Sequence, residues 1–171
     1  VQPLPPIVAI GASTGGPPAL LTVLSAFPVE FRAAVIVCQH VEGGFDDALA
    51  SWLSRESGHH VATVGERTMP RAGNVYLAVP GAHLVLEGQH LERTALPSGS
   101  VHLPSIDVLF QSLARGARRH CTAAALLTGM GRDGVEVHVL RACNWPAAER
   151  GAAPDPRAHA SALPTKRKTR P

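Results

Sequence analysis

The chain has 171 residues, of which 45% are hydrophobic and 17% charged, and this length accommodates one domain with a substantial core. It contains no run of about 18 or more apolar residues, which excludes a membrane-spanning helix. The net charge of +3 comes from the C-terminal end, where residues 138–171 hold seven Lys or Arg against two acidic residues. Residues 1–137 hold nine basic and eleven acidic residues without a basic stripe, so we expect no nucleic-acid partner.

The N-terminal segment VQPLPP has neither the basic start nor the apolar centre of a secretion signal. The three cysteines are an odd number and show no metal-binding spacing, so they indicate no disulfide framework. Together these features predict a cytoplasmic protein with reduced thiols and no insertion into a membrane.

A strand and a helix alternate at the start of the chain. Residues 7–10 form an apolar run that predicts a buried strand. The residues that follow predict a helix with Thr14 or Gly15 at its N-cap, and two prolines in its first turn are compatible with this assignment. A second buried strand is predicted at residues 34–38.

The middle of the chain changes character. After a glycine-bearing loop, Asp46 or Asp47 is expected to cap a second helix. Residues 61–93 alternate between apolar and polar side chains and predict short antiparallel strands with a hairpin. Ser105 then opens another amphipathic helix, and residues 123–127 predict a third buried strand that ends in TGMGRDG.

The recurring order of strand, glycine loop and helix predicts the fold class. We expect an α/β protein with a doubly wound, mainly parallel sheet flanked by helices, and a small antiparallel hairpin region. In such sheets, functional groups gather at the carboxyl ends of the strands. Three polar residues come just after predicted buried strands, namely Ser13, His40 and Asp133. These three residues are the candidate catalytic groups.

The first candidate lies in the stretch GASTG, which satisfies the G-x-S-x-G pattern between a strand and a helix. Such a turn exposes a serine hydroxyl as a nucleophile, or it cradles a phosphate on backbone N–H groups. The glycine spacing differs from G-x-G-x-x-G, and no acidic residue ends the second strand to hold a ribose. Taken alone, the pattern leaves the nucleophile and a phosphate-binding turn both open.

His40 and Asp133 are candidates for the two groups that a serine nucleophile needs. An imidazole accepts the hydroxyl proton, and a carboxylate holds the imidazole in the right tautomer. The alternative for Asp133 is a cap on the helix expected directly after it. Gly129 and Gly131 leave backbone N–H groups free, on either side of Met130, to meet an oxyanion. The other eight histidines are interpreted as surface residues: His59, His60, His83, His90, His102, His120, His138 and His159.

Four stretches, IGASTGGPPAL, QHVEGGF, PSIDVLF and LLTGMGRDG, together closely resemble the catalytic domain of the CheB family of chemotaxis protein-glutamate methylesterases. The resemblance covers residues 7–137. It implies hydrolysis of glutamate γ-methyl esters on the cytoplasmic helices of methylated chemoreceptors, with release of methanol and, in many relatives, deamidation of glutamines. It implies no metal and no organic cofactor. A receiver domain precedes the esterase in most relatives, so such a domain and its histidine kinase pathway are further partners that the resemblance allows.

The same resemblance assigns roles to five residues. Ser13 is the nucleophile, His40 the general base and Asp133 its orienting partner. The backbone N–H of Met130 resembles an oxyanion-hole donor, and Thr14 lies beside the nucleophile. These roles agree with the chemistry that the residue types alone indicate.

The sequence departs from the family pattern at two places. Val41 and Glu42 stand where relatives have Met-Pro. After Glu136, where relatives continue with a helix, a strand and a final helix, this chain has an Ala/Pro/Arg-rich end. We therefore interpret residues 1–137 as a methylesterase-like catalytic domain that could lack its last elements, and residues 138–171 as an atypical, largely disordered tail.

Two other functions stay open at this point. A catalytically impaired remnant of the enzyme would still bind receptor helices as a binding module. A nucleotide-binding domain would use the glycine-rich turn to hold a phosphate. A Ser13→Ala variant separates the enzyme from the binding module, and dialysis against NAD or ATP tests the third possibility.

Overall fold

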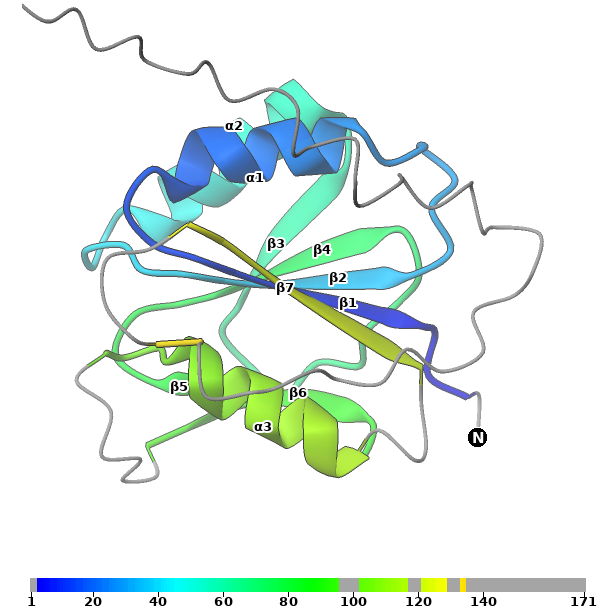
Figure 1. The fold of residues 1–171 in the computed structure, drawn as a ribbon, viewed down its shortest axis with the longest axis vertical. Helices are drawn as coiled ribbons and strands as arrows, with labels where there is room; N and C mark the ends of the chain where they lie inside the picture. The colour runs from blue at the N-terminus through cyan, green and yellow to red at the C-terminus, as the bar shows by residue number, and fades with distance from the viewer. Residues whose placement is uncertain (1–2, 96–101, 117–120, 129–132, 135–171) are drawn as a thin grey trace, which may run out of the picture.

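The computed structural model describes residues 3–95, 102–116, 121–128 and 133–134 of the chain. In these ranges the chain forms a sheet of five parallel strands in the order β3-β4-β2-β1-β7 (Figure 1). Its strands are β1 (Ile7–Ala12), β2 (Ala34–Gln39), β3 (His60–Val64), β4 (Asn74–Ala78) and β7 (Thr122–Thr128). A second, two-stranded sheet is an antiparallel hairpin made of β5 (His83–Glu87) and β6 (His90–Thr94).

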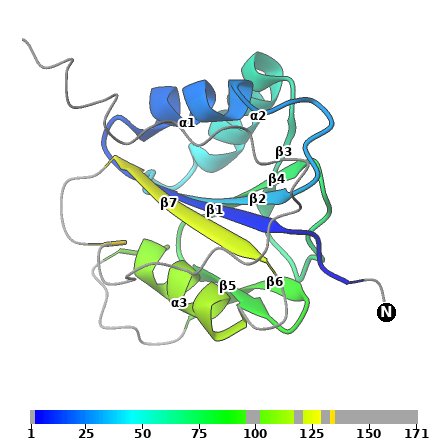
Figure 2. The same cartoon turned by 45° about the vertical axis from the view of Figure 1, so that its right-hand side comes forward.

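Other elements cover both faces of the five-stranded sheet. Helices α1 (Gly16–Ser25) and α2 (Asp46–Ser57) lie on one face, and α3 (Ile106–Gly116) lies with the β5–β6 hairpin on the other (Figures 1 and 2). Because successive side chains of a strand point to opposite faces, the sheet separates two apolar cores. This arrangement confirms the predicted α/β fold, with its doubly wound, mainly parallel sheet and its small antiparallel region.

Two strands in the middle of the chain run in a direction that differs from the prediction. β3 and β4 are parallel to each other, and Val75 of β4 pairs with Val61 on one side and Val35 on the other. The antiparallel arrangement expected over residues 61–93 was therefore wrong for these two strands, although β5 and β6 do form a hairpin. Alternating apolar residues fit either direction of a strand, because they report only which side chains face the core.

The first two helices begin with different caps. Gly15 is the N-cap of α1, with a φ of 75° and no side-chain cap hydrogen bond, so the cap is Gly15 and not Thr14. This left-handed conformation favours glycine. The N-cap of α2 is Phe45, which corrects the expectation of Asp46 or Asp47. Both aspartates lie in the first turn, where carboxylates interact favourably with the helix dipole.

β7 lies at an edge of the five-stranded sheet and is less buried than the sequence indicates. Within the described residues it pairs with β1 alone. The middle of the strand, residues 124–126, is exposed, and Leu126 retains 42% of its surface. The apolar run at 123–127 thus predicted the strand correctly. The prediction that the strand is buried was wrong, because β7 lies at the edge of the described sheet.

Several sequence-based predictions fall outside the described residues. These are the role of Met130, the helix expected after Asp133 and the disorder of residues 138–171. Among the described helices, none is both long and apolar enough to cross a membrane.

Candidate active site

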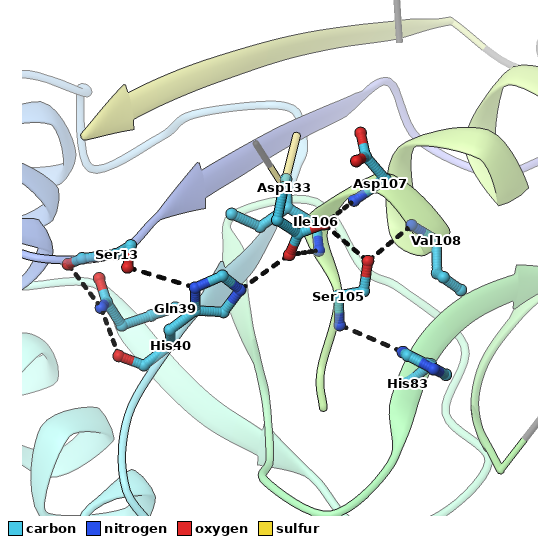
Figure 3. A network of polar contacts seen from close by, with 9 residues as sticks. All are labelled: Ser13, Gln39, His40, His83, Ser105, Ile106, Asp107, Val108 and Asp133. Carbon is cyan, nitrogen blue, oxygen red and sulfur yellow. Dashed lines mark hydrogen bonds and ion pairs between the residues drawn. The ribbon is translucent and has the colours of Figure 1, made fainter. Parts of the chain in front are cut away.

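The carboxyl ends of three neighbouring strands place the candidate catalytic residues next to one another (Figure 3). Ser13 follows β1, His40 follows β2, and Asp133 comes five residues after the end of β7. β1 pairs in parallel with both β2 and β7, so the three strands end on the same side of the sheet. The structure thus brings together the three residues that the sequence singles out.

His40 stands between the other two side chains. Its Nδ1 lies 3.2 Å from Ser13 Oγ, and its Nε2 lies 2.8 Å from Asp133 Oδ2. An ionised carboxylate only accepts hydrogen bonds, so Nε2 carries the ring proton and donates a hydrogen bond to Asp133. Nδ1 is then left to accept a hydrogen bond from the Ser13 hydroxyl. This is the geometry by which an imidazole activates a serine nucleophile.

The start of α3 holds the Asp133 carboxylate in place. The Ser105 hydroxyl donates to Oδ1 at 2.7 Å. The backbone N–H of Ile106 donates to Oδ2 at 2.7 Å, and that of Asp107 donates to Oδ1 at 3.0 Å. The first N–H groups of a helix have no partners within the helix and favour a negative charge. Asp133 therefore caps the N-terminus of α3 while its Oδ2 also accepts a hydrogen bond from His40 Nε2.

These contacts decide the charge of Asp133. Burial by itself raises its pKa, because the side chain is only 7% exposed and burial disfavours the charged form. The hydrogen bonds from His40 and from the start of α3 lower the pKa by more, so it lies well below its usual range. The carboxylate is therefore charged at neutral pH and can stabilise an imidazolium on His40.

His83 also forms a hydrogen bond with Ser105, at the start of α3. Its Nδ1 accepts a hydrogen bond from the backbone N–H of Ser105 at 3.2 Å. Burial lowers the pKa of His83, although the charge of Asp133 opposes this shift. Since His83 is only 2% exposed, its interpretation as a surface residue was wrong. Its position at the start of β5, where the strand meets α3, could not be read from alternation along one strand.

His59, His90 and His102 also differ from the surface positions predicted for them, whereas His60 is exposed as predicted. His59 is 6% exposed, and its Nε2 lies 3.3 Å from the backbone oxygen of Phe27. The ring of His102 is partly buried and stacks on the ring of His40, with 4.3 Å between the ring centroids. His102 thus covers one face of the candidate general base.

The remaining site predictions have different outcomes. Thr14 is exposed and directly follows Ser13. Met130, expected as the oxyanion-hole donor, lies outside the described residues. Within the described ranges, no group of three or more His, Cys, Asp or Glu side chains is arranged to hold a metal ion. Sequence reasoning missed the contacts of Gln39, Ser105 and His83, because it gave Gln39 no role after the strand at residues 34–38 and treated Ser105 only as a helix start.

An apolar pocket of about 450 Å³ opens beside the loop that follows His40. Its wall includes Val41 and Glu42, the two residues at which a departure from the family pattern is expected from the sequence. Phe45 also lines the pocket and is 62% exposed. Val41 and Glu42 thus lie on the surface next to the site, and the pocket is lined by none of the three candidate catalytic side chains.

Known proteins resemble this chain over most of its length. A sequence model described as CheB methylesterase matches residues 8–142. The chain is 46% identical over 129 residues to protein-glutamate methylesterase/protein-glutamine glutaminase 1 of Bordetella avium. It is 43% identical over 129 residues to the protein-glutamate methylesterase/protein-glutamine glutaminase of Mesorhizobium japonicum. Both matches cover 75% of this chain but only 37% and 38% of the relatives, so the chain spans less than two fifths of their length.

The fold also resembles a solved structure. The CheB methylesterase catalytic domain of Thermotoga maritima superimposes with a TM-score of 0.69 at 30% sequence identity. The superposition covers 78% of this chain and 71% of the solved chain. The match of the family model to more than half of the sequence, together with this fold, shows that the chain belongs to the CheB methylesterase family.

Proposed function

We propose that this protein is a serine esterase that hydrolyses glutamate γ-methyl esters on chemoreceptors to glutamate and methanol. The observation that carries the proposal is the continuous path of contacts from Ser13 Oγ through His40 to the buried Asp133 carboxylate. The names of the relatives in Bordetella avium and Mesorhizobium japonicum support the same reaction and add glutamine deamidation.

The first half of the proposed reaction forms an acyl-enzyme. His40 Nδ1 takes the proton of the Ser13 hydroxyl as Oγ attacks the ester carbonyl. Asp133 stabilises the imidazolium that results. The tetrahedral intermediate then breaks its bond to the methoxy oxygen. His40 gives the proton to this oxygen, so the group leaves as methanol. Ser13 is left in ester linkage with the glutamyl side chain.

The second half of the reaction releases glutamate. A water molecule gives a proton to His40 and attacks the acyl carbon. The bond to Ser13 Oγ breaks, and the proton passes from His40 back to Oγ. A glutamine side chain would follow the same route, with ammonia leaving in place of methanol.

The oxyanion of each intermediate needs hydrogen-bond donors. By the family resemblance, we assign this role to the backbone N–H of Met130, a residue outside the described ranges. The N-terminus of α1 starts three residues after Ser13 and adds a favourable partial positive charge. No step of this mechanism uses a metal or an organic cofactor.

The partners follow from the same proposal. The substrate is the cytoplasmic helical region of a methylated chemoreceptor, so the reaction takes place in the cytoplasm. A receiver domain acting in a histidine kinase pathway is the proposed regulatory partner. Val41 and Glu42 lie on the surface over which a receptor helix would approach, so their departure from Met-Pro bears on docking.

The decisive experiment measures methanol release from a methylated receptor fragment, with the wild-type chain compared with Ser13→Ala. Release that disappears in the variant supports the enzyme. Absence of release from both, with binding to the receptor fragment retained, favours an impaired receptor-binding module. Equilibrium dialysis against NAD and ATP tests the nucleotide-binding alternative. We expect no binding, because the backbone N–H groups of Ser13 and Gly16 already donate to Thr128 O and Ser13 O.

A further inference from the structure

Gln39 is buried between the turn that carries Ser13 and the backbone of His40 (Figure 3). Its Nε2 donates one hydrogen bond of 2.9 Å to the carbonyl oxygen of Ser13. The same nitrogen donates a second hydrogen bond of 2.9 Å to the carbonyl oxygen of His40. One amide group therefore joins the backbone of the proposed nucleophile to the backbone of its proposed base.

We infer that Gln39 is a positioning residue, which sets the spacing between Ser13 and His40 for proton transfer. This inference rests on the proposed function, since it concerns the same two groups. The hydrogen bonds of the Gln39 amide go to the main-chain carbonyls of Ser13 and His40, and not to their side chains. Gln39 therefore acts on the two side chains through the backbone.

The sheet itself constrains the other side of each residue. The backbone N–H of Ser13 donates to Thr128 O at 3.0 Å, and that of His40 donates to Ala12 O at 3.1 Å. These bonds hold the N–H groups of both residues. The Ser13 carbonyl also accepts a hydrogen bond of 2.8 Å from the backbone N–H of Gly16, which lies within the serine turn. Gln39 joins this carbonyl to that of His40. Loss of the Gln39 amide would remove this link, so the carbonyl groups of Ser13 and His40 could shift relative to each other.

Gly16 makes room for this amide. A Cβ at Gly16 would overlap the amide group of Gln39, and its oxygen most of all. The backbone of Gly16 has no positive φ, so space and not conformation requires glycine there. The first residue of α1 and the last residue of β2 are therefore fitted to each other.

The Gln39 amide oxygen is buried and has no hydrogen-bond partner within the described residues. A buried acceptor left in this state lowers stability, and such groups in a native protein call for a specific explanation. The two hydrogen bonds that Nε2 donates explain why a polar side chain stands here. An apolar residue would fill the same space without a buried, unpartnered oxygen, but it could not donate these bonds.

Gln39→Met tests the inference by keeping the volume of the side chain and removing both donors. We expect kcat to fall between about 10-fold and 100-fold, because displacements of about 1 Å at reacting groups have effects of this size. KM should change by less than about twofold, because Gln39 does not contact the substrate in this proposal. The same loss should occur for p-nitrophenyl acetate and for the methylated receptor fragment, since both reactions use the same Ser13–His40 pair.

A matched control separates positioning from a loss of stability. Val75→Ala removes buried volume from β4, in the same sheet but away from Ser13 and His40. Active sites are counted with a fluorophosphonate that labels Ser13, and kcat is expressed per labelled site. The rate of labelling should fall in Gln39→Met by the same factor as kcat and stay unchanged in Val75→Ala.

A double-mutant cycle approaches the same contact from Gly16. Gly16→Ala alone should lower kcat, because the added methyl displaces the Gln39 amide. Gln39→Ala leaves space for the methyl group. In that background, Gly16→Ala should therefore lower kcat only slightly further. Equal losses from Gly16→Ala in both backgrounds would overturn the inference, as would a kcat of Gln39→Met equal to that of Val75→Ala.

The labelling experiment also separates this inference from the proposed function. If labelling of Ser13 depends on Gln39 but no methanol is released from the receptor fragment, the positioning role holds and the proposed substrate fails. If wild-type Ser13 is labelled no faster than in a His40→Ala variant, His40 does not activate Ser13, and both proposals fall.

Discussion

The Ser105 hydroxyl donates a hydrogen bond of 2.7 Å to the Asp133 carboxylate, which fixes the proposed orienting carboxylate to the start of α3. Ser105 Oγ also accepts a hydrogen bond from the backbone N–H of Val108 at 3.3 Å, so the same hydroxyl caps the helix. The Ser105 side chain thereby stabilises α3 and also orients the Asp133 carboxylate.

Ser105→Ala should therefore affect both stability and catalysis. Loss of an N-cap lowers the free energy of unfolding by about 1 kcal/mol. We also expect kcat to fall by at least about tenfold, because Oδ1 of Asp133 loses one of its two hydrogen-bond donors and keeps only the N–H of Asp107. Urea unfolding and ester hydrolysis measure the two effects, with Ser51→Ala on the exposed side of α2 as a control. A stability loss with unchanged kcat would show that Ser105 only caps the helix.

Asp133→Asn should leave the fold in place and remove most of the activity. The side-chain amide keeps the shape of the carboxylate but cannot stabilise a positively charged His40, and its NH₂ group favours the wrong tautomer. We expect kcat to fall on the order of 10³-fold to 10⁴-fold, as for other serine triads. Steady-state hydrolysis of p-nitrophenyl acetate measures the loss, and a decrease of less than tenfold would remove Asp133 from the mechanism.

The low pKa of Asp133 also predicts how stability depends on pH. The pKa is lower in the folded chain than in the unfolded chain, so ionisation of Asp133 contributes stability above its unfolded value of about 4. This contribution is lost as the pH falls from about 4 toward the folded pKa. Urea unfolding between pH 7 and pH 3 should show wild type losing stability relative to Asp133→Asn at the acidic end. A constant difference across this range would contradict the prediction.

Gly134 allows Asp133 to reach α3. Its φ is 91°, and an added Cβ would lie 2.8 Å from Ile106 Cγ2 and 2.9 Å from Leu126 Cδ1. We expect Gly134→Ala to lower stability by about 1–3 kcal/mol, because the backbone is strained and the neighbours must shift. It should also lower kcat, since Asp133 is the adjacent residue.

Gly88→Ala is the matched control for this variant. Gly88 has a φ of 62°, and an added Cβ would meet nothing within 4 Å. This glycine lies in the turn between β5 and β6, so its replacement should cost stability without changing kcat. Equal kcat values for the two alanine variants would show that the position of Asp133 does not depend on Gly134.

The ends of the strands were the most predictable part of this protein. The stretch around Ser13 joins an apolar run to small residues, and His40 follows a second apolar run. Parallel strands end on the same side of a sheet, so local patterns were enough to suggest that these side chains meet. The family resemblance adds their chemical roles.

The groups that hold these side chains could not be predicted in the same way. The contact between Ser105 and Asp133 joins residues 28 positions apart, and the one between Ser105 and His83 spans 22 positions. Both depend on how α3 packs on β5, which periodicity along a single element does not report. The parallel direction of β3 and the exposure of Leu126 were missed for the same reason, because pairing partners decide them.

The separation between His40 and Asp133 has a consequence for how the protein acquires its reactivity. Ser13 and His40 emerge from the ribosome early, whereas Asp133 is synthesised 93 residues after His40. It can meet His40 only when β7, the last described strand, adds to β1 at the edge of the sheet. Closing a loop of this length costs entropy, so we expect the contact between His40 and Asp133 to form late in folding. Labelling of Ser13 by a fluorophosphonate during refolding should then lag behind recovery of the circular dichroism signal. A partly folded chain would then have Ser13 in position, but its serine would not react until Asp133 met His40.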